Sequence, residues 1–285
     1  MRNVRGAALV CAGLIVSGTA TAADEPPKLG WSDQAELSYV LTAGNSESTT
    51  LGLKNELKRT WEAATFSFKL AAIRAESSTF FRTAVGTPDS FVFVEDKESA
   101  LTAENYLAAL RYDRKITSFF FWYGGTSWER NRFAGVENRE IVEGGVGNIW
   151  VDRDDVKFKT NYALTYTDQE DVVEVPDQDG AFAGVRLGWD YLHRFGAATT
   201  YVNTLILDDN LEDTSDWRAD MLNSVTVAMN KRLALKAGLK WLYDAQPAFE
   251  AVPLQDALGT PTGEIALVEL DNLDTIFTTS LVVNW

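Results

Sequence analysis

Hydrophobic and polar residues alternate along most of this chain. Between positions 31 and 42, Leu37 and Tyr39 fall on one side of an extended backbone, whereas Gln34 and Glu36 fall on the other. A period of two is typical of β-strands with two different faces. The pattern predicts twelve strands, most of them near the length that a tilted strand needs to cross a bilayer: 31–42, 49–61, 65–75, 98–112, 116–129, 141–150, 156–167, 180–193, 197–207, 217–229, 233–243 and 274–285.

The links between these strands differ in length on the two sides. Links after odd-numbered strands are mostly long: 76–97, 130–140, 168–179, 208–216 and 244–273, with 43–48 as a short exception. Links after even-numbered strands are tight turns: 62–64, 113–115, 151–155, 194–196 and 230–232. Long loops at one end and short periplasmic turns at the other are typical of outer-membrane barrels.

The tryptophans support the same architecture. Trp31, Trp61, Trp150 and Trp285 fall at the end with the short turns, and Trp128, Trp217 and Trp241, with Tyr243, fall towards the long loops. This distribution is typical of the two aromatic girdles of a membrane-spanning barrel. A soluble β-sandwich is the alternative, because a sheet with one wet face also alternates. The run 119–123 is aromatic on both faces and leaves the orientation of its strand open.

The final strand ends in an aromatic residue, Trp285. Thr275, Phe277, Thr279, Leu281, Val283 and Trp285 share one face of it. We expect the barrel-assembly machinery of the outer membrane to recognise this terminal strand.

The first residues have the features of a secretory signal peptide. Arg2 and Arg5 form a basic start, an apolar run covers Ala7 to Val16, and Ala20-Thr21-Ala22 is a small-x-small cleavage pattern. The prediction is a cleaved signal over 1–23 and one barrel domain over 24–285. Cys11, the only cysteine, lies inside this segment, and Val10 before it argues against a lipoprotein site.

Charge narrows the classes of function. Without Arg2 and Arg5, 24 basic residues remain against 41 acidic ones, a net charge of −17. This balance argues against a nucleic-acid partner. After the signal, no apolar run approaches 18 residues, so the membrane would have to be crossed by a closed barrel.

Several short motifs resemble a known family. They are Gly30-Trp31-Ser32, 41–46, 49–51, Asn131-Arg132-Phe133-Ala134-Gly135 and Glu143-Gly144-Gly145-Val146-Gly147. Together they resemble the YdiY-like family of salt-induced outer-membrane proteins, formally domain-of-unknown-function family 481. The resemblance implies an outer-membrane barrel and no settled activity, so it lends no catalytic residues. The long segment 244–273 and the acidic loops depart from the family pattern.

The predicted loops are strongly acidic. Segments 168–179, 208–216 and 244–274 carry 6, 5 and 7 acidic residues and no lysine or arginine. They are either simply solvated or create a negative field that enriches cations and binds divalent ions. Asp208, Asn210, Glu212 and Asp213 are weak candidates for a calcium site, because the glycine and distal glutamate of an EF-hand loop are missing.

The polar faces of the strands give a second candidate site. If the barrel closes as predicted, a set of charged side chains points inward: Glu36, Lys54, Glu56, Lys58, Arg111, Glu143, Lys157, Lys159, Arg186, Asp190, Arg218, Asp220, Lys236 and Lys240. Mixed charges inside a barrel either pair and plug it or line a water channel. Twelve strands lie between the filled and the open cases, so the strand number does not decide.

Catalysis has little support in the sequence. His193 is the sole histidine and lies beside a short turn, whereas a lipid-active serine enzyme needs a base near the outer leaflet. The sequence has no Gly-x-Ser-x-Gly motif and no cluster of histidine and cysteine, and no cofactor is predicted.

The sequence therefore predicts an all-β, antiparallel transmembrane barrel of about twelve strands, located in the outer membrane. The favoured function is a small channel for ions or small solutes, linked by the resemblance to salt response. The alternatives are a non-conducting structural or cation-binding barrel and, third, a lipid-active enzyme. Expected partners are membrane lipid and lipopolysaccharide at the upper aromatic belt. Whether 76–97 or 244–273 plugs the barrel stays open.

Overall fold

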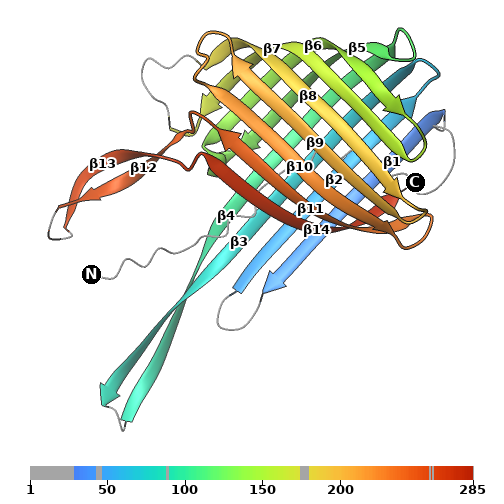
Figure 1. Ribbon diagram of the computed structural model, residues 1–285. Coiled ribbons are helices and arrows are strands. Elements are labelled where there is room, and N and C mark those ends of the chain that lie inside the picture. Colours follow the sequence, from blue (N-terminus) through green and yellow to red (C-terminus); the bar gives the residue numbers. More distant parts are fainter. Residues whose placement is uncertain are drawn as a thin grey trace.

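A computed structural model describes residues 29–42, 47–87, 90–173, 180–256, 258 and 260–284. Twelve of its strands close into an antiparallel barrel, and two further strands form a separate hairpin (Figure 1). The predicted signal peptide and Trp285 lie outside the described residues.

The strands follow the chain in an up-and-down order. Each barrel strand pairs with its neighbours along the chain, except that β14 follows β11 and closes the barrel on β1. The elements are β1 (Gly30–Thr42), β2 (Glu47–Thr60), β3 (Ala64–Thr87), β4 (Ser90–Lys115), β5 (Phe120–Asn131), the short 3-10 helix η1 (Arg132–Ala134), β6 (Val136–Asp152), β7 (Val156–Asp171), β8 (Ala181–Phe195), β9 (Thr199–Asn210), β10 (Trp217–Ala228), β11 (Leu233–Asp244), β12 (Phe249–Gln255), β13 (Pro261–Glu269) and β14 (Leu273–Asn284).

Closure comes from the first and last strands. The register runs from Gln34 opposite Asn284 to Leu37 opposite Leu281. A closed sheet pairs the backbone of its spanning strands, which a bilayer requires because lipid supplies no hydrogen-bond partners.

The alternation predicted from sequence separates the two surfaces of the barrel wall. Leu37, Leu53, Leu164 and Phe277 are exposed on the outside. Glu36, which precedes Leu37 in β1, is buried inside. An apolar exterior and a polar interior on a closed antiparallel sheet define a transmembrane barrel of the outer-membrane type. The predicted fold class is confirmed.

The orientation of β5, which the sequence left open, follows from its packing. Phe121 and Tyr123 are buried inside the barrel, and Trp122 between them is exposed on the outside. The adjacent strand β6 has a glycine, Gly147, opposite Phe121. A Cβ at this position would lie 2.3 Å from Cζ of Phe121, so the absence of a side chain leaves space for the ring.

The prediction of a loop over 76–97 is wrong. β3 and β4 continue as a paired ribbon until Thr87 faces Ser90 (Figure 1). β2 ends its pairing with β3 at Ser78, and β5 ends its pairing with β4 at Asn105. The ribbon therefore extends beyond its neighbouring strands by about ten residues on each strand, roughly 30 Å at the usual rise of a strand.

The long link predicted over 244–273 contains strands of its own. This segment contains the β12–β13 hairpin, which forms its own two-stranded sheet and projects away from the barrel wall (Figure 1). β12 and β13 alternate weakly and carry a proline each, so the strand pattern is faint in the sequence.

Other boundaries shift by a few residues. Positions 113–115, predicted as a turn, complete β4, and the turn lies at 116–119, where the amide of Ile116 donates to the carbonyl of Phe120. The predicted loop 130–140 is largely ordered as η1 and the start of β6. β7 and β9 likewise run into the predicted loops 168–179 and 208–216.

Aromatic residues mark both ends of the barrel. Trp31, Trp61 and Trp150 are exposed at the end with the short turns, called the short-turn end below. At the other end, the long-loop end, Trp217 stacks on Tyr243 with ring centroids 4.7 Å apart. No helix in the described part of the chain is long and apolar enough to span a membrane.

Candidate functional site: the charged interior of the barrel

The structure places the predicted charged residues on the inner face of the wall, and ion pairs join them across neighbouring strands. The members of this set are Glu36, Lys54, Glu56, Lys58, Arg111, Glu143, Lys157, Lys159, Arg186, Asp190, Arg218, Asp220, Lys236 and Lys240. That they line a pore stays a prediction.

Arg186 on β8 connects three strands. Its Nε and Nη2 donate to the two carboxylate oxygens of Asp208 on β9, at 2.6 and 2.9 Å. Its Nη1 donates to Oε2 of Glu143 on β6 at 2.9 Å. A bidentate pair of this kind fixes both direction and charge, so this part of the inner wall is rigidly arranged.

Arg111 on β4 forms a second centre. Its guanidinium contacts both oxygens of Asp113, donates to Oδ1 of Asn161 at 3.1 Å and lies 3.7 Å from the ring centroid of Tyr123. Asn161 in turn donates to Asp190, which Lys159 approaches to 3.4 Å. Polar contacts therefore continue from β4 to β8 across the inner wall.

Lysines gather on the wall formed by β1, β2, β3 and β11. Nζ of Lys236 donates to Oε1 of Glu36 at 3.0 Å. Lys58 and Lys69 lie 3.4 and 3.7 Å from the same oxygen of Glu56. Lys54 lies within electrostatic range of both glutamates. Among the described contacts, Glu36 and Glu56 thus lie close to four lysines of this wall.

Opposite walls approach each other. Lys69 on β3 is within electrostatic range of Asp190 on β8, which lies almost across the barrel from it. Leu222, Ile276 and Val282 point inward and are at most 1% exposed. Inward side chains therefore occupy part of the interior.

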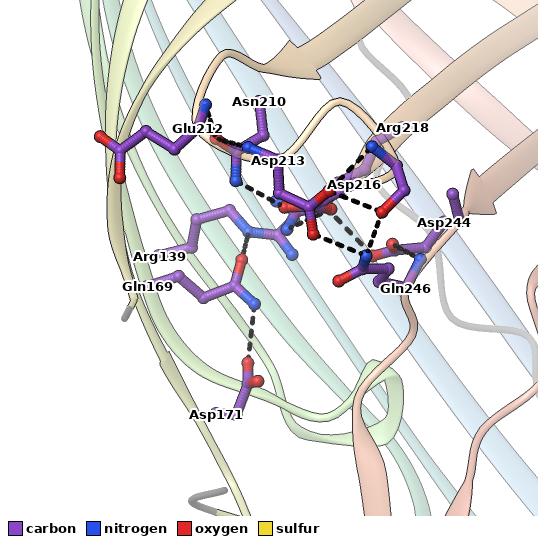
Figure 2. A network of polar contacts seen from close by, with 12 residues as sticks. Arg139, Gln169, Asp171, Asn210, Glu212, Asp213, Asp216, Arg218, Asp244 and Gln246 are labelled. Carbon is purple, nitrogen blue, oxygen red and sulfur yellow. Dashed lines mark hydrogen bonds and ion pairs between the residues drawn. The ribbon is translucent and has the colours of Figure 1, made fainter. Parts of the chain in front are cut away.

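A second polar network covers the long-loop end (Figure 2). Nε of Arg139 donates to Oε1 of Gln169 at 2.7 Å, and Gln169 donates to Asp171. Arg218 lies 3.2 Å from Asp244 and 3.5 Å from Asp216. Arg139 on β6 comes within electrostatic range of Arg218 on β10, four strands away in the barrel.

The loops at this end also make contact across the mouth. Ala248, at the base of the β12–β13 hairpin, packs against Gly135, which ends η1 on the opposite side of the barrel. Gly135 has φ +78, and a Cβ there would lie 2.2 Å from Cβ of Ala248. Only glycine fits this contact, because the position is both left-handed and crowded. The mouth is thus bridged by residues on either side of β12–β13.

The weak calcium candidates are engaged elsewhere. Asp208 points inward to Arg186, and Oδ1 of Asn210 accepts from the amides of Glu212 and Asp213. Hydrogen bonds from Ser215 and Gln246 hold the pKa of Asp213 below its usual value. Among the described residues, no group of three or more His, Cys, Asp or Glu is placed to hold a metal ion. The calcium site remains a prediction without structural support.

His193 belongs to the outer aromatic surface at the short-turn end. Its ring stacks on Phe195 at 4.2 Å, and Nδ1 lies 3.1 Å from the hydroxyl of Tyr191. It is part of β8 and not a solvated turn residue.

Sequence reasoning missed several members of the interior. Asp113 falls in a segment that the sequence predicts as a turn, and Lys69, Glu129 and Arg139 are not among the predicted charged residues of the interior. Their inward orientation follows from their positions, because each lies an even number of residues from another inward-facing residue of the same strand. Glu129 and Arg139 lie in or beside a segment predicted as a loop, where this rule was not applied.

A closed twelve-stranded wall, apolar outside and charged inside, defines a transmembrane β-barrel of the outer-membrane type. Within this class, the chain belongs to the family described as "Protein of unknown function, DUF481", which it matches over residues 35–285.

Solved structures of barrels resemble the chain at low identity. The NanC porin is 11% identical, with 88% of this chain and 98% of that chain covered and a TM-score of 0.45. The KdgM porin in complex with disordered oligogalacturonate is 8% identical, covers 90% and 99%, and has a TM-score of 0.43. An anion-selective porin from Comamonas acidovorans is 9% identical, covers 90% and 99%, and has a TM-score of 0.39. A comparison with curated proteins found no match.

Proposed function

We propose that this protein is a narrow passage for ions or small solutes through the outer membrane. The observation that carries the proposal is the continuity of charged side chains along the interior. They run from Arg139 and Arg218 at the long-loop end, through Arg186 and Arg111, to Lys159 near the short turns.

Exposure at the short-turn end supports a passage. Lys159 and Asp190 form an inward-facing pair whose side chains are 42% and 37% exposed. Water therefore reaches the charged interior from this end. An ion entering here would exchange its hydration for charged and amide groups already fixed in place.

A non-conducting barrel is the second candidate. It is favoured by the buried inward side chains of Leu222, Ile276 and Val282, and by the loop contact of Gly135 with Ala248 over the mouth. In this alternative the ion pairs hold the wall together, and the acidic loops contact divalent cations at the membrane surface.

Lipid hydrolysis is disfavoured by the position of His193. Its ring is stacked against Phe195 at the short-turn end, and its Nδ1 contacts Tyr191. A serine hydrolase would instead need the histidine beside a nucleophile.

Location and partners belong to the same proposal. The apolar exterior fits a bilayer, Trp217 and Tyr243 fit contact with lipopolysaccharide at the long-loop end, and the strand leading to Trp285 fits recognition by the assembly machinery. A link to salt response is added by the family resemblance alone.

Solute flux into vesicles tests the proposal. Refolded protein in phospholipid vesicles should let small sugars and salts enter after an osmotic step, so that the vesicles swell, whereas heat-unfolded protein should not. Vesicles that stay tight, although the barrel is folded as judged by its heat-dependent shift on a gel, would favour the non-conducting alternative.

A further inference from the structure

Ion pairs in the long-loop half of the barrel turn their carboxylates toward solvent. The four pairs are Asp208 with Arg186, Asp220 with Lys240, Asp244 with Arg218, and Glu129 with Arg139. The carboxylate side chains are 28–31% exposed, whereas their cationic partners are only 6–19% exposed. Although each pair is neutral, water and ions in this half meet mainly negative groups.

In the short-turn half, the cations are more exposed than most of their carboxylate partners. Lys58 and Lys69 are 23% and 21% exposed, but the Glu56 that they share is 9% exposed. Arg111 is 26% exposed, its close partner Asp113 is 24% exposed, and Glu143 behind it is 12% exposed. These cations lie near the short-turn ends of β2, β3 and β4. Ions in this half therefore meet mainly positive groups.

Electrostatic contacts across the interior include like charges in each half. Asp220 on β10 is within electrostatic range of Asp208 and of Glu129 on the facing strand β5. Lys69 is within range of Lys58 and Arg111, as well as of the carboxylate of Asp190. Arg139 and Arg218 also approach each other at the long-loop end, where both are less exposed than their partners Glu129 and Asp244.

The remaining pairs do not all follow this order. Arg218 also contacts Asp216, whose side chain is less exposed than that of the arginine, at 12% against 19%. Lys236 and Glu36 are both almost fully buried and present neither sign. Glu143 lies between Arg111 and Arg186 and marks the boundary between the two halves. Near the short turns, Lys159 and Asp190 are exposed to a similar degree.

We infer that the interior is bipolar, with a cation-attracting zone of carboxylates at the long-loop end and an anion-attracting zone of lysine and arginine at the short-turn end. The inference rests on the proposed passage and adds its electrical character. A passage with two oppositely charged zones in series conducts unequally in the two directions.

The sign of the asymmetry follows from the arrangement. When the long-loop side is positive, cations are driven in through the carboxylate zone and anions through the lysine zone, so both accumulate and the current is high. Reversed voltage drives each ion first into the zone that repels it, and the passage is depleted of ions. The current should therefore be larger with the long-loop side positive.

Single-channel recording at equal and opposite voltages measures this asymmetry. Symmetric potassium chloride at about 0.1 M leaves fixed charges effective over about 10 Å, whereas about 1 M reduces this range to about 3 Å. Rectification should be clear in the first solution and nearly lost in the second. The orientation of the inserted protein is determined with the variant Leu258→Cys, whose cysteine lies at the 91% exposed tip of β12–β13. A bulky thiol reagent that cannot cross the membrane is added to one chamber and labels this cysteine only when the tip faces that chamber.

Two variants and a control test the origin of the asymmetry. Lys58→Gln combined with Lys69→Gln removes accessible cations, and Glu129→Gln removes an accessible carboxylate while Arg139 keeps Gln169 as a partner. Each should reduce rectification. Arg153→Gln is the control, because Arg153 pairs with a similarly exposed Asp155 in the turn between β6 and β7, outside the charged interior, and it should leave rectification unchanged.

The outcomes separate this inference from the proposed function. Rectification of the stated sign that is weakened by both variants supports the bipolar interior. Steps of current that are equal in both directions, or larger in the opposite direction, or unchanged in both variants, overturn it while leaving a passage. A folded barrel that never conducts overturns the passage and the bipolar interior together.

Discussion

At the scale of single residues, glycine decides how the inner face of β6 packs. A Cβ on Gly147 would lie 2.3 Å from Cζ of Phe121 and 2.5 Å from the carbonyl oxygen of Thr160. The second contact is with backbone, which cannot move aside as a side chain can. The interior beside β5 is therefore closed to any larger residue.

Gly147→Ala should destabilise the barrel by about 1–3 kcal/mol, the usual cost of overpacking. Unfolding in denaturant, followed by tryptophan fluorescence of the protein in lipid vesicles, measures it. Gly144→Ala is the matched control on the same strand, because no atom lies within 4 Å of its Cβ. Equal stability of the two variants would contradict the packing described here.

The pair of Lys236 and Glu36 is the most deeply buried ion pair described, with side chains 4% and 8% exposed. Lys236→Met leaves Glu36 without this partner and should cost about 3–5 kcal/mol of unfolding free energy. Lys157→Met, at an exposed pair, should cost about 0–1 kcal/mol. A double change of Lys236 and Glu36 to methionine that is no more stable than Lys236→Met alone would argue against the pair.

Much of the inner face could be predicted from sequence, residue by residue. Glu36, Arg186 and Lys240 follow from alternation, because their neighbours are clearly apolar. Phe121 and Tyr123 could not be predicted in this way, since aromatic residues on both faces of β5 remove the contrast. Their inward position depends on glycines of the neighbouring strand, which only the register reveals.

At the scale of elements, the β3–β4 ribbon and the β12–β13 hairpin lie beyond the pattern of the barrel. Pro88 and Asp89 form a turn signal between segments rich in aromatic and β-branched residues. This turn signal lies inside the long link predicted over 76–97. Strand boundaries elsewhere are close to the predicted ones, because apolar alternation ends where the wall leaves the bilayer.

The ribbon beyond Ser78 should be dispensable for the barrel. Replacing residues 79–98 by a two-residue turn removes strands that pair only with each other, so refolding yield and heat-dependent gel mobility should stay unchanged. Removing residues 65–68 instead would shorten a strand paired on both sides and should abolish folding. A ribbon deletion that fails to fold would show that the ribbon guides assembly of the wall.

The loop between β9 and β10 should respond to acid through Asp213. Its folded pKa is lowered, so its bonds to Ser215 and Gln246 stabilise the loop above the ordinary carboxyl pKa of about 3.9 and are lost as the pH falls through the lowered value. Carbon NMR of the Asp213 carboxyl group measures this titration. Ser215→Ala should raise the pKa, and an unchanged midpoint would contradict the role of the serine.

At the scale of the whole molecule, charge is arranged so that a negative protein has a partly positive interior. Glu36 and Glu56 lie close to four lysines on the wall of β1, β2, β3 and β11. Acidic residues of the β9–β10 loop, among them Asp213 and Asp216, lie at the opposite end. The closed barrel could be predicted from alternation, but this separation of charge depends on which partner of each pair is exposed, and that is a property of packing.

Neutralising the lysine wall should change ion preference. Lys54→Gln combined with Lys58→Gln removes two positive charges near Glu56, so the reversal potential in a salt gradient should shift toward cation selectivity. A reversal potential equal to that of the unmodified barrel would show that these lysines do not face the path of the ions.

The central claim is that the charged interior conducts. The most direct measurement is the current through a planar bilayer that contains refolded protein, with a salt gradient across it. Discrete steps of current, absent for the unfolded chain, are the predicted result. A correctly folded, heat-modifiable barrel that remains silent at all voltages would contradict the claim and identify the ion pairs as a structural filling of the barrel.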